Sequence, residues 1–142
     1  MCKKELARRW FLKGCRYDST GSERDKAIDA YRRSLKYDDE LTDAYVNLGF
    51  IYLAGTDYEK AAKCFQDVVG LEPKNPEAFN NLGYVYEEMK RLGCARQAYR
   101  QASGLDPKNV ETLLNLAKVY ELEGNYHDAV KQYKRAIKQD AD

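Results

Sequence analysis

The sequence predicts an all-α protein in which antiparallel helix pairs stack into a solenoid. The main indication is a 34-residue repeat, because the segment 42–75 returns as 76–109 and again as 110–142. Within each copy, apolar residues recur at the i, i+3, i+4 and i+7 spacing of an amphipathic helix. A glycine or another small residue also recurs at fixed places, which allows two helices to approach closely.

The first helix of each copy carries four matching positions. They are an aromatic residue or leucine, a leucine, a small residue and a tyrosine. The members are Tyr45, Phe79 and Leu113, then Leu48, Leu82 and Leu116, then Gly49, Gly83 and Ala117, then Tyr52, Tyr86 and Tyr120. We expect this face to be buried, because the spacing places all four positions on one side of a helix.

The second helix of each copy repeats an alanine, an aromatic residue and a small apolar residue. The members are Ala61, Ala95 and Ala129, then Phe65, Tyr99 and Tyr133, then Val68, Ala102 and Ala136. Turn residues mark the helix starts: Thr56 with Glu59 predicts a capping box, and Asn75 before Pro76 predicts a cap followed by a first-turn proline.

A less regular unit precedes these three copies and fits the same template if one extra residue is allowed between its two helices. Its matching residues are Trp10, Gly14, Tyr17, Gly21, Ala27 and Tyr31. We therefore expect a single domain over residues 1–142, with four units at approximately 7–41, 42–75, 76–109 and 110–142.

This arrangement resembles the tetratricopeptide repeat family, whose helix-turn-helix unit has these residue types at these spacings and a proline near its end, as at Pro73 and Pro107. The resemblance covers nearly the whole chain. The departures are Ala117 at a glycine, Asp39 and Ala141 at prolines, and Lys13 at a leucine. The resemblance implies a right-handed superhelical solenoid whose first helices line a concave groove, and a protein-interaction scaffold as its function.

The first-helix residues that do not pack inward are expected to line this groove, with an apolar half followed by an acidic half. The predicted peptide-binding residues are Phe11, Val46, Asn47, Phe50, Leu53, Glu77, Asn81, Tyr84, Glu87, Glu88, Asn115, Lys118 and Glu121. The three asparagines recur with the repeat and could grip a peptide backbone, although helix packing is an alternative role for them. The expected ligand is an extended or helical peptide with apolar and basic side chains.

Two other functions stay open. Val130, Tyr133 and Ile137 of the last helix are expected to remain partly exposed, so this unit could stack on another copy, or on further sequence if the chain is a fragment. RNA binding by a related helical repeat is a minor alternative. It is opposed by the nearly balanced charge, with 24 Lys and Arg against 23 Asp and Glu.

Nothing in the sequence points to catalysis, a cofactor or a metal ion. His127 is the one histidine and is expected on an exposed turn, and the four cysteines lie too far apart for a zinc knuckle. We interpret the cysteines as reduced, small apolar residues of the core. No apolar run could span a bilayer and no signal peptide is visible, so we expect a soluble cytoplasmic protein without a membrane or nucleic-acid partner.

Overall fold

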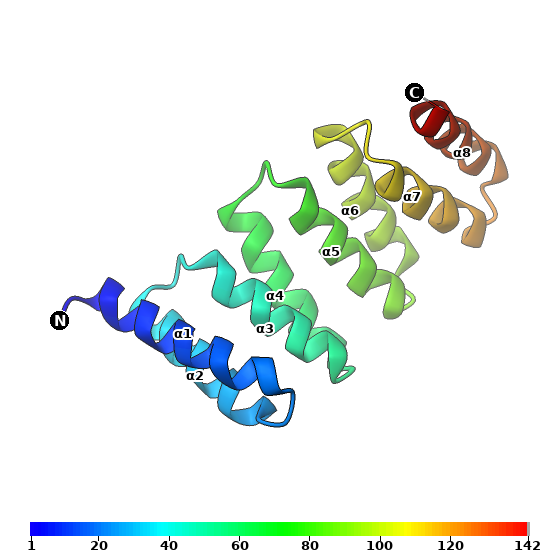
Figure 1. Ribbon diagram of the computed structural model, residues 1–142. Helices are drawn as coiled ribbons and strands as arrows, with labels where there is room; N and C mark the ends of the chain where they lie inside the picture. The colour runs from blue at the N-terminus through cyan, green and yellow to red at the C-terminus, as the bar shows by residue number, and fades with distance from the viewer. Residues whose placement is uncertain (142) are drawn as a thin grey trace. The chain divides into compact units, whose positions relative to one another are not determined.

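The computed structural model describes residues 1–141, and over that range it contains eight helices and no strand. The helices are α1 (Lys3–Thr20), α2 (Arg24–Tyr37), α3 (Thr42–Ala54), α4 (Tyr58–Leu71), α5 (Pro76–Glu88), α6 (Leu92–Leu105), α7 (Val110–Leu122) and α8 (Tyr126–Ala141). Each odd-numbered helix packs against the even-numbered helix that follows it (Figure 1). The predicted all-α class and the four helix pairs are confirmed.

The chain divides into two compact units, residues 1–71 and residues 72–142. The first unit holds α1 to α4, and within it α3 packs on α2. The second unit holds α5 to α8, and within it α7 packs on α6. The expectation of one continuous domain stays a prediction.

An aromatic ring packed against a glycine joins the helices of a pair. In the first pair, a Cβ built on Gly14 would lie 2.6 Å from the ring of Tyr31. In the third pair, a Cβ on Gly83 would lie 2.6 Å from the ring of Tyr99. Atoms cannot approach that closely, so the glycine is required for the two backbones to come together around the ring.

The second and fourth pairs show the same contact in two variants. Phe65 is the ring of the second pair, and a Cβ on Gly49 would lie 2.7 Å from it. In the fourth pair Ala117 replaces the glycine, and the matching ring, Tyr133, is only half-buried. The three rings that pack on a glycine, Tyr31, Phe65 and Tyr99, are all fully buried.

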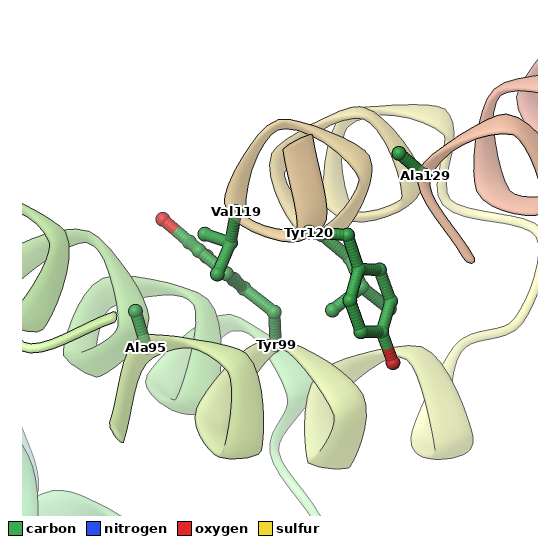
Figure 2. Packing of buried hydrophobic residues seen from close by; sticks show 6 residues of the cluster. Ala95, Tyr99, Val119, Tyr120 and Ala129 are labelled. Atoms are coloured by element: carbon green, nitrogen blue, oxygen red, sulfur yellow. The ribbon is translucent and has the colours of Figure 1, made fainter. Parts of the chain in front are cut away.

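The core of the second unit continues from α6 across α7 to α8. Figure 2 shows Tyr99 and Ala95 of α6 beneath Val119 and Tyr120 of α7, with Ala129 of α8 on the other side. These side chains form one buried cluster with Leu116. Apart from Val119, the residues of this cluster occupy positions that the repeat marked as inward-facing.

The helix starts agree with the sequence in one case and differ in another. Asn75 caps α5, because its side-chain oxygen accepts a hydrogen bond from the backbone N–H of Glu77 at 3.1 Å. The expected start of α4 at Thr56 is wrong by one residue. The carbonyl of Asp57 accepts the first helical bond, and Thr56 has a φ of 60° while its hydroxyl donates to the carbonyl of Gly55.

Replacing Gly83 by alanine should destabilise the protein, because the new methyl group overlaps the ring of Tyr99. We expect a loss of about 1–3 kcal/mol from overpacking, partly offset by about 1 kcal/mol of helix propensity. Gly104→Ala is the matched control, since a Cβ there meets nothing within 4 Å. It should stabilise by about 0.5–1 kcal/mol. Urea unfolding measures both changes, and equal effects would contradict the packing role.

Candidate functional site

In the first unit, two of the predicted ligand-contacting residues contact Tyr31. The ring of Phe11 lies 5.7 Å from the ring of Tyr31, between centroids. Asn47 donates from Nδ2 to the Tyr31 hydroxyl at 3.2 Å, and that hydroxyl lies 3.2 Å from the Asp18 carboxylate, to which it donates. Burial raises the pKa of Tyr31, so the hydroxyl stays a donor at neutral pH. Asn47 is therefore held in place by the fold.

A pocket of about 370 Å³ opens next to Asn47, where α1 ends and α2 begins. Phe50 forms part of its apolar wall. This side chain is 46% exposed, and its ring packs edge-on against Phe65 at 5.3 Å between centroids. Val46 and Leu53 lie half-buried on the same helix, outside the lining. The pocket is lined by Tyr17, Asp18, Gly21, Arg24, Asn47, Phe50, Ile51, Ala54 and Gly55.

In the second unit, Glu87 is tied into the fold. Its Oε1 accepts a hydrogen bond from the Tyr99 hydroxyl at 3.1 Å, and its Oε2 lies 3.0 Å from Nζ of Lys118. The Glu87 side chain is only 11% exposed, and that of Lys118 is 59% exposed. The hydrogen bond to Glu87 raises the pKa of the Lys118 ammonium. The two charges compensate each other, so this face is less acidic than the sequence predicts.

The other predicted residues of the second unit lie on α5 and α7 without a common pocket. Their carboxylates point to solvent, their asparagines are half-buried, and Tyr84 is 47% exposed. The exposed group comprises Glu77, Tyr84, Glu88 and Glu121, and the half-buried group comprises Asn81 and Asn115. The row of carboxamides along a groove stays a prediction.

The structure also shows a repeated tyrosine–carboxylate hydrogen bond that the sequence analysis did not predict. Asp18 and Glu87 occupy equivalent positions of the repeat, and each accepts a hydrogen bond from the tyrosine of its own pair. In the second pair both positions change together, to Leu53 and Phe65. This covariation between repeats was a visible signal that the carboxylate belongs to the packing as well as to the surface.

The cysteines differ in their surroundings. Cys64 is buried, and burial raises the pKa of its thiol to about 11. Cys15 is half-buried, whereas Cys2 and Cys94 are exposed, so the expected core role is wrong for those two. Across residues 1–141, no three His, Cys, Asp or Glu side chains are placed to hold a metal ion. His127 is exposed near the start of α8.

No helix within the described part of the chain combines the length and the apolar character needed to cross a membrane.

Glu87→Ala and Glu88→Ala should separate the structural carboxylate from the exposed one. The first change leaves the buried Tyr99 hydroxyl without its acceptor and should cost about 1–3 kcal/mol of unfolding free energy. The second should stay within about 0.5 kcal/mol, because Glu88 is exposed. Adding Tyr99→Phe to Glu87→Ala should recover part of the loss. If Glu87→Ala changed the unfolding free energy as little as Glu88→Ala, Glu87 would have no structural role.

Alkylation at pH 8 should label Cys94 rapidly and leave Cys64 protected. With its pKa near 11, the Cys64 thiol is ionised to only about one part in a thousand at that pH, and it is buried as well. Mass spectrometry of the digested protein measures the labelling of each site, and urea should remove the difference. Fast labelling of Cys64 in the native protein would contradict its burial.

Comparison with known proteins agrees with this architecture. A model described as TPR repeat matches residues 51–90, and one described as Tetratricopeptide repeat matches residues 87–142. No curated protein gives a significant match to the sequence.

Solved structures show the same fold at low sequence identity. "Crystal structure of MamA" superposes with a TM-score of 0.87 at 22% identity and covers 95% of this chain and 78% of the other. "MamA 41-end from Desulfovibrio magneticus RS-1" gives 0.84 at 18% identity, with 95% and 76% covered. The structures show a shared fold, and the two matching models, which together span residues 51–142, show that the chain belongs to the tetratricopeptide repeat family.

Proposed function

We propose that this protein is a non-catalytic interaction scaffold that binds a peptide segment with apolar and basic side chains on the exposed faces of its first helices. The observation that carries the proposal is the pocket beside Asn47 and Phe50. Its volume of about 370 Å³ suits a single side chain and part of the backbone of a peptide. Ligand sites in proteins span roughly 300–1,000 Å³.

The chemistry of this pocket favours an apolar anchor. Phe50, Ile51 and Ala54 supply hydrocarbon surface, and covering Phe50 would remove a half-exposed aromatic ring from water. Full burial of such a side chain contributes roughly 1.5–3 kcal/mol. Asn47 and Asp18 stand at the polar side of the pocket, where a carboxamide and a carboxylate can receive the N–H groups of a peptide.

The charge of the first helices in the second unit favours basic residues in the ligand. Glu77, Glu88 and Glu121 are exposed, while the cation of Lys118 is paired with Glu87. The remaining field is negative, which attracts lysine and arginine and steers their approach. Because Glu87 is already paired with Tyr99 and Lys118, basic side chains of the ligand would contact the other three carboxylates.

Self-assembly is a second candidate, because Val130 and Ile137 of α8 are 49% and 69% exposed. Copies that stack end to end would bring α8 against α1, which carries Lys3, Lys4, Arg8, Arg9, Lys13 and Arg16 against Glu5 and Asp18. Lys131, Lys134 and Lys138 of α8 would face that basic helix and repel it. We therefore rank self-assembly below peptide binding. RNA binding ranks last, given a net charge of only +1.

Peptide arrays of basic-apolar, acidic and neutral sequences test the proposal. Basic-apolar peptides should bind selectively, and Phe50→Ala should weaken the best of them about 10- to 100-fold by removing the apolar wall. Leu105→Ala is the control, because Leu105 is similarly exposed but lies at the end of a second helix. Helicity of each variant is checked by circular dichroism. Equal loss in both variants, or preference for acidic peptides, would refute the proposal.

A further inference from the structure

The outer face of α8 carries an apolar stripe that the described residues leave uncovered. Tyr126, Val130, Tyr133 and Ile137 follow one another at i, i+4, i+7 and i+11, which places them on one side of the helix. Tyr126, Val130 and Ile137 are all exposed, and Tyr133 is half-buried. Such a continuous stripe marks a contact surface rather than scattered surface residues.

Helices α2 and α6 occupy the same place in their pairs as α8, and they show what kind of element packs on this face. Tyr133 corresponds to Tyr99 of α6 and to Tyr31 of α2, and both of those rings are fully buried. Helix α7 covers α6, and α3 covers α2. In Figure 2, Val119 and Tyr120 of α7 lie over the Tyr99 side of α6. In both places the covering element is a helix. Helix α7 carries charged residues beside its apolar face, whereas α3 is apolar over most of its length.

A hydrogen bond follows the same pattern. Tyr31 donates to Asp18 at 3.2 Å and Tyr99 donates to Glu87 at 3.1 Å, each beneath a covering helix. Glu121 occupies the equivalent position for Tyr133. Within residues 1–141, no hydrogen bond joins Tyr133 to Glu121. A helix laid on α8 would exclude water from Tyr133 and favour a third tyrosine–carboxylate hydrogen bond, so the α8 face resembles the faces of α2 and α6 that other helices cover.

The charges beside the stripe restrict which kind of helix can pack there. Lys134 and Lys138 lie next to the stripe on the side away from the buried Ala129 and Ala136. Between α6 and α7, Arg96 forms an ion pair with Glu123 at 2.6 Å, although Arg96 occupies the repeat position of Val130 rather than that of Lys134 or Lys138. Basic residues on the accepting helix therefore call for carboxylates on the covering one.

We propose that the outer face of α8 binds an acidic amphipathic helix of a partner protein, with leucine, valine and tyrosine at the spacing found in α7. This surface is separate from the first-helix faces assigned to peptide binding, and the inference does not depend on that function. A second copy of the chain is a poor occupant, because its α1 is basic and carries Lys13 where α7 has Leu116.

A peptide with the sequence of residues 109–124 is the probe, since it contains α7 and three glutamates. Fluorescence anisotropy of the labelled peptide with the full chain should show saturable binding, weak because the peptide pays for its own folding. Val130→Asp with Ile137→Asp should weaken it at least about tenfold, as should replacing the three peptide glutamates by lysine. Leu71→Asp and Phe50→Ala, which lie on α4 and α3, should leave the affinity for this peptide unchanged.

Circular dichroism and urea unfolding confirm that each variant is folded, and Val130→Ser with Ile137→Ser replaces the aspartate pair if that pair unfolds. In the wild-type protein, ¹H–¹⁵N spectra should place the largest shifts in α8, including Tyr133. Absence of binding at about 1 mM peptide, a range in which even weak partners associate, would overturn the inference. So would unchanged affinity of the α8 variants, or tighter binding of a peptide with the basic sequence of residues 3–20, which would indicate a second copy instead.

Discussion

The contact between an aromatic ring and a glycine is the constraint on which the rest of the structure depends. Tyr31, Phe65 and Tyr99 each fill the space that the side chain of Gly14, Gly49 or Gly83 would occupy. Because this contact sets how close the two helices of a pair come, it also sets which of their faces remain outside. The exposed faces of the helices are what is left once these rings are buried.

The hydroxyl of the buried tyrosine links the core to the surface. Where the ring is tyrosine, its hydroxyl emerges beside a carboxylate, Asp18 or Glu87, and organises the polar groups around it. In the first unit that group includes Asn47, which borders the pocket. In the second unit it draws in Lys118 and removes one carboxylate from the acidic face. The same core position therefore organises polar groups at the surface of both units.

Much of this could be predicted from the sequence, because the repeat supplies several copies of each position. The helix pairs, the inward faces and the Asn75 cap follow from local spacing and local hydrogen bonds. The role of Glu87 could not be read from local spacing, since its partners are Tyr99 and Lys118, 12 and 31 residues further along the chain. Only the comparison of repeats with each other contains that information.

The cysteines and the start of α4 illustrate a second limit. Residue type alone suggested a buried role for Cys2 and Cys94, but both are exposed, Cys2 just before the start of α1 and Cys94 in the first turn of α6. At the start of α4, Thr56 and Asp57 are both good capping residues, and the positive φ of Thr56 decides between them. Backbone geometry in a turn is set by the two helices it joins, which composition does not reveal.

The central claim is that the buried faces of the helices form the fold and that the first helices present the peptide-binding surface. Mapping of amide chemical shifts during titration with a basic-apolar peptide tests it most directly. The account predicts the largest shifts along α1, α3, α5 and α7, with those near Asn47 and Phe50 prominent. Shifts confined to α2, α4 and α6 would contradict it.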